Sequence, residues 1–175
     1  MELAGGPTRD EVLAIDLFQL DLRKTDRFVD IGCGTGRVSL EAARRVKKVW
    51  AVDRRGEAIA FARANAAAAR VANIEFIHRG AVQFLEDHDE GFDCAFVGGS
   101  RDLPQVLERL ADLVERRIVV NAVLLGTLQE AITTLQRLGI FREALQVQVA
   151  KSSPLAGGIR FHAGDPVYVI IGGRS

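Results

Sequence analysis

The chain has 175 residues, a formal net charge of zero and 48% hydrophobic residues, enough for one globular domain with a single core. A neutral chain lacks the positive charge that neutralises phosphates, so nucleic acid is not expected as an obligatory partner. No apolar run is long enough to span a membrane, and no signal peptide is evident at the amino terminus. Neither Cys33 nor Cys94 has the spacing of a zinc site. We therefore expect a single domain over residues 1–175 in the cytoplasm, with no metal and no membrane partner.

The first 25 residues are predicted to form an amino-terminal arm and a helix. Thr8 and Glu11 have the spacing of a capping box, which makes Thr8 the predicted N-cap of an amphipathic helix that reaches about Leu20. This helix is expected to cover one edge of the core.

A short β-branched run, Phe28–Ile31, predicts a buried strand that leads into three glycines at alternate positions, Gly32, Gly34 and Gly36. Glycine allows a positive φ and lets a ligand approach the backbone, and the helix predicted from Val38 aims its first amide groups at the same gap. The spacing is neither G-x-G-x-x-G nor that of a phosphate-binding P-loop. Alone, the triplet is also compatible with a tight turn that binds nothing.

The second predicted strand, Lys48–Val52, ends at Asp53. A carboxylate at this place in an α/β fold accepts hydrogen bonds from ribose hydroxyls, although Asp53 could also be a plain turn residue. The pattern then predicts a helix over Glu57–Arg70, a strand over Ile74–His78, a short helix that opens at Gly80 and Ala81, a strand over Phe92–Val97, a helix over Pro104–Glu115, a strand over Arg117–Val120 and a helix over Thr127–Leu138.

The carboxyl-terminal part has a different pattern. Phe141–Ala150 and Val167–Ile171 read as two strands with no helix between them, so they are expected to pair antiparallel. Lys151–Pro166 is predicted to be a polar loop that closes over the carboxyl ends of the strands, where ligands bind in open α/β sheets.

The pattern Asp30-x-Gly32-x-Gly34-x-Gly36 resembles motif I of the class I S-adenosylmethionine-dependent methyltransferases. The resemblance implies an α/β three-layer sandwich, Rossmann-like, with a seven-stranded sheet of order 3-2-1-4-5-7-6 and strand 7 antiparallel. It also implies S-adenosyl-L-methionine as cofactor, with its methionine end inside the glycine loop and its amino group beside Asp30.

Five segments together are similar to one narrower family: Pro7–Val12, Asp30–Gly36, Phe96–Ser100, Val119–Val123 and Gln146–Val149. They resemble the decarboxylating C15-methyltransferases of cobalamin biosynthesis, which act on cobalt-precorrin-6B or its cobalt-free counterpart. This implies an anionic tetrapyrrole substrate, loss of CO₂ from the ring C acetate, a homo-oligomer that is often a tetramer, and a separate C5-methyltransferase as partner. The strand-four segment lacks the clamp of enzymes that methylate the amino groups of adenine or cytosine.

The resemblance implies which residues form the site. The predicted cofactor-binding residues are Thr8, Asp30, Gly32, Cys33, Gly34, Thr35, Gly36, Asp53, Arg54, Gly80, Ala81 and Gly98. The predicted substrate-binding residues are Ser100, Arg101, Asn121 and Arg160. Gly80 departs from the family, whose members usually carry an acidic residue there. Methyl transfer from a sulfonium needs alignment and a dry pocket more than a strong base, so no catalytic acid or base is assigned.

Several alternatives stay open. Asn121 could be a core amide, Ser100 an N-cap, and the arginines solvated charges. The protein could be a class I methyltransferase for another substrate such as tRNA, although one Trp and one Tyr offer few stacking side chains. It could also be a non-catalytic subunit that binds the cofactor.

Overall fold

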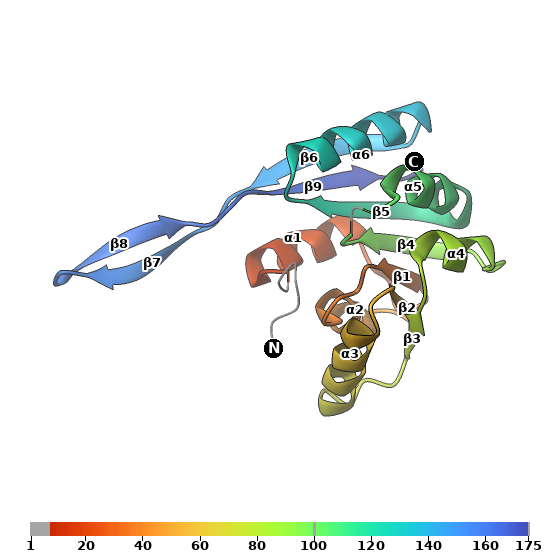
Figure 1. The fold of residues 1–175 in the computed structure, drawn as a ribbon, viewed down its shortest axis with the longest axis horizontal. Helices are drawn as coiled ribbons and strands as arrows, with labels where there is room; N and C mark the ends of the chain where they lie inside the picture. The colour runs from red at the N-terminus through yellow and green to blue at the C-terminus, as the bar shows by residue number, and fades with distance from the viewer. Residues whose placement is uncertain (1–7, 100, 175) are drawn as a thin grey trace.

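The computed structural model describes residues 8–99 and 101–174. Its helices are α1 Asp10–Leu20, α2 Arg37–Ala43, α3 Gly56–Ala68, α4 Ala81–Glu86, α5 Leu103–Leu113 and α6 Leu125–Arg137. Its strands are β1 Arg27–Ile31, β2 Lys48–Asp53, β3 Ile74–His78, β4 Phe92–Val97, β5 Val114–Ala122, β6 Phe141–Val147, β7 Ala150–Leu155, β8 Gly158–Ala163 and β9 Val167–Gly172. Figure 1 shows these elements as a helix-covered sheet from which a thin two-stranded hairpin extends.

The central sheet has seven strands in the order β3-β2-β1-β4-β5-β9-β6. The strands from β3 to β5 are parallel to their neighbours, and β9 runs antiparallel to both β5 and β6. Since β9 is the last strand of this sheet in the chain, the predicted order 3-2-1-4-5-7-6 with an antiparallel final strand is confirmed.

The alternation of side chains along β1 explains the three layers. Val29 and Ile31 pack with residues of α4, α5 and α6, whereas Phe28 packs with residues of α1 and α2. Successive side chains of a strand point to opposite faces of the sheet. A parallel strand that is covered by helices on both faces therefore carries apolar side chains on both. The carboxyl ends of the parallel strands therefore form one open edge.

Several predicted boundaries were wrong. The strand predicted to reach Ala150 ends at Val147, and β5 is longer at both ends than the predicted Arg117–Val120. The N-cap of α1 is Arg9, whose side chain makes no capping bond, and not Thr8. Glu11 does not complete a capping box, and its carboxylate forms an ion pair with the Lys151 ammonium at 2.7 Å. The helix predicted to reach Glu115 ends at Leu113, and Val114 is already extended and begins β5.

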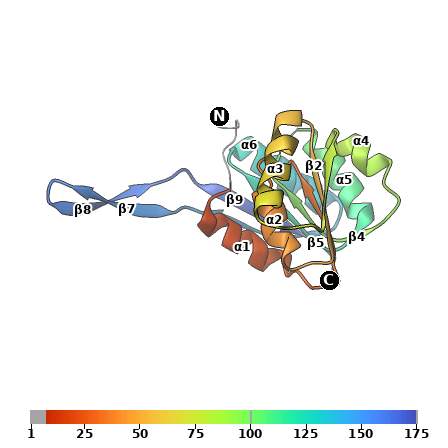
Figure 2. The same ribbon diagram turned by 90° about the horizontal axis from the view of Figure 1, so that it is seen from below.

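The predicted loop Lys151–Pro166 was also wrong, because it forms the hairpin of β7 and β8. Leu155 pairs with Gly158 across a two-residue turn in which Ala156 and Gly157 have φ values of 46° and 80°. Two positive φ values match the twist of a hairpin. The hairpin, which we call the arm, projects away from the body in both Figure 1 and Figure 2, and so does not fold back over the strand ends.

Candidate cofactor site at the strand ends

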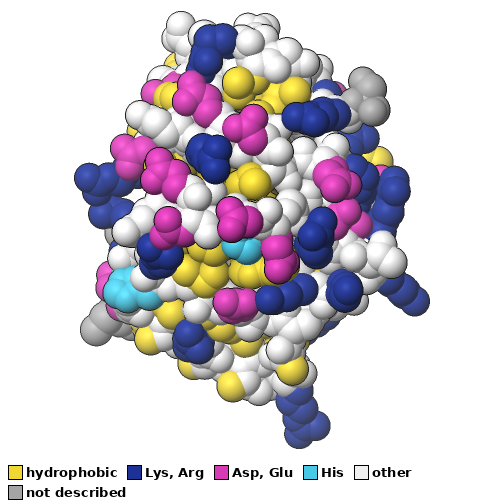
Figure 3. Space-filling view, turned by 90° about the vertical axis from the view of Figure 1, so that its right-hand side faces the viewer, with side chains coloured by type: hydrophobic (Ala, Val, Ile, Leu, Met, Phe, Trp, Pro, Cys, Tyr) yellow, Lys and Arg dark blue, Asp and Glu magenta, His cyan; other side chains and the backbone are white. Residues whose placement is uncertain are grey.

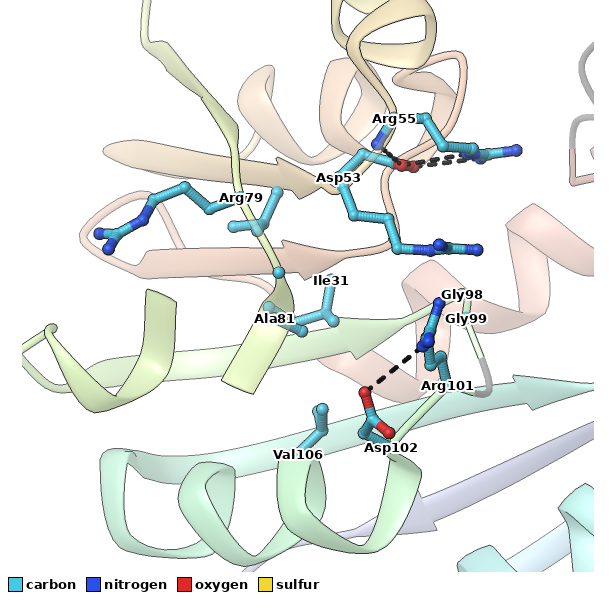
Figure 4. A pocket seen from close by; sticks show the side chains of 14 residues that line it. Ile31, Asp53, Arg55, Arg79, Ala81, Gly98, Gly99, Arg101, Asp102 and Val106 are labelled. Carbon is cyan, nitrogen blue, oxygen red and sulfur yellow. Dashed lines mark hydrogen bonds and ion pairs between the residues drawn. The ribbon is translucent and has the colours of Figure 1, made fainter. Parts of the chain in front are cut away.

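A cavity of about 580 Å³ lies at the carboxyl ends of β1, β2, β3 and β4. It is lined by Ile31, Gly32, Val52, Asp53, Arg54, Arg55, Arg79, Gly80, Ala81, Gly98, Gly99, Arg101, Asp102 and Val106, and most of these are labelled in Figure 4. The fold thus brings together seven residues that the sequence assigned to the site: Gly32, Asp53, Arg54, Gly80, Ala81, Gly98 and Arg101.

The three glycines after β1 have different tasks. Gly32, Gly34 and Gly36 have φ values of 75°, 55° and 78°, a region that side chains disfavour. A Cβ on Gly32 would lie 3.0 Å from the backbone N of Gly99, and one on Gly36 would lie 2.9 Å from the Cβ of Ala62. At Gly34 the nearest atoms would be 4.0 Å away. Gly32 and Gly36 therefore allow close packing, while Gly34 leaves space for a ligand.

Asp53 ties the end of β2 to the glycine loop. Its Oδ2 accepts hydrogen bonds from the backbone N of Gly34 at 3.0 Å and from Nη2 of Arg55 at 3.1 Å. Its Oδ1 accepts from the backbone N and Nε of Arg55, at 2.9 and 3.1 Å. Burial acts to raise the pKa of Asp53, but the bonds from Arg55 and Gly34 outweigh it and lower the pKa. Asp53 is therefore a fixed carboxylate at neutral pH.

Arg55 was missed by the sequence analysis. It lines the cavity and forms an ion pair with Asp53, visible in Figure 4. The only signal for it was its position two residues after a strand-end carboxylate, where its backbone N and its side chain can both return to the same acid. Four hydrogen bonds already occupy Asp53, which is as many as a carboxylate readily accepts. A ribose hydroxyl at Asp53 would thus have to replace a bond from Arg55.

Asp30 lies behind the glycine loop. It is fully buried and is not among the residues that line the cavity. Its Oδ2 accepts a hydrogen bond from the Ser39 hydroxyl, and its Oδ1 has no hydrogen-bond partner among the described residues. Burial raises the pKa of Asp30 to about 7. Its contact with a cofactor amino group stays a prediction.

Asn121, at the end of β5, meets a residue that the sequence did not single out. Its Nδ2 donates a hydrogen bond of 2.7 Å to Oδ2 of Asp16 on α1. Asp16 is fully buried, and burial raises its pKa to about 7. Asn121 is not part of the cavity lining. This bond favours the core-amide interpretation of Asn121, and its substrate role remains a prediction.

The other predicted residues are dispersed. Cys33 is buried, and burial raises the pKa of its thiol. The backbone carbonyl of Thr35 accepts a hydrogen bond of 3.0 Å from Nδ2 of Asn65. Thr8 precedes α1 and does not line the cavity, and Ser100 lies outside the described residues. Arg160 is on β8 and lines a second cavity at the base of the arm.

A metal-binding cluster and a membrane-spanning helix are both absent from residues 8–99 and 101–174. No group of three or more His, Cys, Asp or Glu side chains is arranged to hold a metal ion there. Within the same ranges, no helix has both the length and the apolar character needed to cross a membrane.

Comparisons with known proteins agree along almost the whole chain. Residues 2–171 match a family described as the precorrin methyltransferase domain. A relative from Methanosarcina acetivorans, described as a probable cobalt-precorrin-6B C(15)-methyltransferase (decarboxylating), is 39% identical over 98% of this chain and 96% of its own. A relative of the same description from Methanosarcina mazei is 38% identical, with the same coverage.

Solved structures show the same fold. A crystal structure described as precorrin 8W decarboxylase, from Methanobacterium thermoautotrophicum, has a TM-score of 0.93 and 33% identity, covering 99% of this chain and 96% of that one. A precorrin-6y C5,15-methyltransferase structure from Geobacter metallireducens has a TM-score of 0.91 and 29% identity, covering 99% and 94%. A tRNA (m1A58) methyltransferase from Aquifex aeolicus, at 16% identity, TM-score 0.75 and coverage of 95% and 69%, shares the fold alone.

Proposed function

The chain belongs to the precorrin methyltransferase family, and from that premise we propose that it methylates C15 of a precorrin or cobalt-precorrin. The same reaction sequence releases the ring C acetate carboxyl group as CO₂. The observation that carries the proposal is the near-complete match to relatives of that description, which covers 98% of this chain. The enzyme is expected to act in the cytoplasm.

S-adenosyl-L-methionine is the proposed ligand of the cavity at the strand ends, and when bound it would supply an electrophilic methyl group. The space above Gly34 would admit its methionine part, and the carboxylate of Asp53 would accept from its ribose in place of a bond from Arg55. A Cβ on Gly80 would have no atom within 4 Å, so the edge formed by Gly80 and Ala81 has room for a flat base. The task of these residues is to hold the cofactor in line with C15.

The carboxylates of a tetrapyrrole are proposed to meet the cationic side of the same cavity. Arg79 is in an ion pair with Asp87 at 2.6 Å, and Arg101 is in one with Asp102 at 3.7 Å. These pairs are solvent-accessible and therefore weak, so a substrate carboxylate can compete for the guanidinium groups. The Arg101 side chain points toward Asp102 at the cavity rim in Figure 4.

Decarboxylation needs no catalytic acid or base from the protein at the step that releases CO₂, because the tetrapyrrole itself accepts the electrons. The bond between the acetate methylene and the carboxyl carbon breaks, CO₂ leaves, and the electron pair passes into the conjugated ring. The protein must hold the other carboxylates and keep the reacting one poorly solvated. This role suits arginine forks around an apolar wall such as Ile31, Val52 and Val106.

The arm supports a homo-oligomer, with a tetramer as the expected form. Ile159 and Phe161 lie two positions apart on β8, on the same face of the arm, and are 77% and 72% exposed. A contiguous apolar surface of this kind usually marks an association site. We propose that the arm packs on another copy of the chain, and that a separate C5-methyltransferase acts on the same tetrapyrrole.

A tRNA substrate has less support. On the face opposite the arm, Lys, Arg, Asp and Glu side chains are interspersed rather than sorted into a basic surface (Figure 3). The discriminating experiment offers labelled S-adenosylmethionine with either the tetrapyrrole or unmodified tRNA. Label in the tetrapyrrole supports the proposal. Label in tRNA favours the second substrate class, and tight cofactor binding without any transfer would assign a non-catalytic role.

A further inference from the structure

A second cavity, of about 520 Å³, lies where the arm meets the body, and its lining includes Arg9, Lys151, Ser153, Arg160, His162 and Gly164. We propose that this cavity binds carboxylate groups of the tetrapyrrole, so that the base of the arm forms part of the substrate site. The inference rests on the proposed function and extends the substrate site beyond the cofactor cavity.

Arg9 is held in place by the arm itself. Its Nη1 donates a hydrogen bond of 3.2 Å to the backbone carbonyl of Asp165. A Cβ on Gly164 would lie 2.9 Å from the guanidinium carbon of Arg9, so the missing side chain at this position leaves the space that the guanidinium fills. A cation fixed in this way loses little further freedom when a carboxylate binds.

The two faces of the arm are chemically different. Lys151 lies directly opposite His162, and Ser153 lies opposite Arg160. These alternate positions share one face of the hairpin, where Nε of Arg160 donates a hydrogen bond of 3.2 Å to Oγ of Ser153. The intervening pair of Pro154 and Ile159 is on the other face. One face is therefore cationic, and the other is the apolar face proposed to pack on a second copy.

Cations outnumber carboxylates at this cavity. Arg9, Lys151 and Arg160 are in its lining, and no Asp or Glu of residues 8–99 or 101–174 belongs to it. The carboxylate of Glu11 pairs with Lys151 at 2.7 Å and fastens α1 to the arm. Two arginine forks remain for a ligand, and a guanidinium binds a carboxylate through paired hydrogen bonds. The site therefore suits an organic anion with more than one carboxylate.

The position of the arm makes the substrate the best candidate for this ligand. Since β6 and β5 are both antiparallel to β9, β6 runs in the direction of the parallel strands and ends at their carboxyl edge. The arm continues from that end, so it leaves the body at the edge that also holds the cofactor cavity (Figure 1). A tetrapyrrole is wide and carries carboxylates around its rim, so one molecule can present several of them to this edge.

The test uses uroporphyrin, a tetrapyrrole with carboxylates on every ring, in a fluorescence titration of the full chain. The double variant Arg9→Gln, Arg160→Gln is expected to raise the dissociation constant about tenfold or more, since it removes two charged hydrogen-bonding partners. The matched control Lys24→Gln, Lys47→Gln removes two exposed charges elsewhere and is expected to stay within about twofold of the wild type. Titration with S-adenosylhomocysteine confirms that each variant is folded.

Equal affinity of the wild type and the double variant for uroporphyrin would overturn the inference, and so would the absence of saturable binding by the wild type. Displacement of uroporphyrin by an equal concentration of inorganic phosphate would assign the cavity to a free anion and would also overturn it. The proposed function is judged separately. If the wild type methylates its tetrapyrrole and the double variant keeps the same KM, only this inference fails. If the wild type methylates no tetrapyrrole, the proposed function itself is rejected, and the further inference that rests on it is rejected as well.

Discussion

Nδ2 of Asn121 donates a 2.7 Å hydrogen bond to the carboxylate of Asp16, a residue 105 positions earlier in the chain. The bond joins the buried side of α1 to the end of β5, next to the edge where the strands finish. The remaining side-chain oxygens, Oδ1 of Asp16 and Oδ1 of Asn121, have no hydrogen-bond partner among the described residues. The pair is therefore a buried polar contact whose strength depends on the charge of Asp16.

The first prediction is that the stability of the protein falls as the pH rises toward neutrality, and that Asp16→Asn reduces this fall. Burial raises the pKa of Asp16 from 3.8 to about 7, so between these values the folded chain keeps a proton that the unfolded chain has released. Each such group then lowers the free energy of unfolding by about 1.4 kcal/mol per pH unit, until the pH passes the folded-state value. Urea unfolding across this window measures the effect.

The variant keeps an amide oxygen that can accept from Asn121, so the contact survives without the charge. Asp30, whose pKa burial also raises to about 7, remains as a second source of the same slope. The free energy of unfolding of Asp16→Asn relative to the wild type should thus increase with pH. Parallel curves for the two proteins would show that Asp16 does not titrate in this range.

The second prediction concerns Gly34. Gly34→Val places a branched side chain at a φ of 55° in the one open position of the glycine loop, and it should abolish binding of S-adenosylhomocysteine in a calorimetric titration. Gly126→Val is the control. Gly126 is on α6, outside the glycine loop, and a Cβ at this position would have no atom within 4 Å. Wild-type affinity in Gly34→Val would remove the cofactor from this loop.

The third prediction concerns Asp53. Asp53→Ala removes an acceptor for ribose and also the bonds that hold Gly34 and Arg55. Binding of S-adenosylhomocysteine should weaken by roughly 1.5–3 kcal/mol, the usual loss for hydrogen bonds to a charged group. Asp89→Ala, at an exposed position, is the matched loss of one carboxylate and should change nothing. A loss below about half a kcal/mol would reduce Asp53 to a turn residue.

The fourth prediction concerns the arm. Replacing Ile159 and Phe161 by serine should convert the oligomer into single chains in analytical ultracentrifugation, because the apolar face of the arm would no longer drive association. Phe18→Ser, which changes an exposed phenylalanine on α1, is the control and should keep the assembly. A wild-type protein that sediments as a single chain would contradict the proposed role of the arm.

The strands that carry the site could be predicted from their short apolar runs, which are largely buried in β1, β2 and β4. Phe92–Val97 and Ile74–His78 have the predicted bounds, and β1 differs by one residue. The order of the sheet followed from the family resemblance. The arm could not be predicted, because Pro154 lies inside β7. Proline lacks the N–H that a strand uses and argues against a strand except at an edge.

The sequence predicted the site residues that belong to a motif at a strand end, but not those that the packing of distant segments brings together. Gly32 and Gly98 follow strands, Asp53 ends one, and all three line the cavity. Asp16 was missed because an acidic residue within a helix usually faces water, and only the packing of α1 on β5 buries it. Thr8 is not the cap because α1 begins at Asp10 with Arg9 as its N-cap, and Glu11, its expected reciprocal partner, pairs with Lys151 instead.

The most direct test of the central claim is the mass of the tetrapyrrole after incubation of the wild type with cobalt-precorrin-6B and methyl-labelled S-adenosylmethionine. The proposed function predicts a product that has gained one labelled methyl group and lost one CO₂. A product with the label and its full set of carboxyl groups would confirm the methyltransferase and contradict the decarboxylation. An unchanged tetrapyrrole, with the cofactor bound, would contradict the account as a whole.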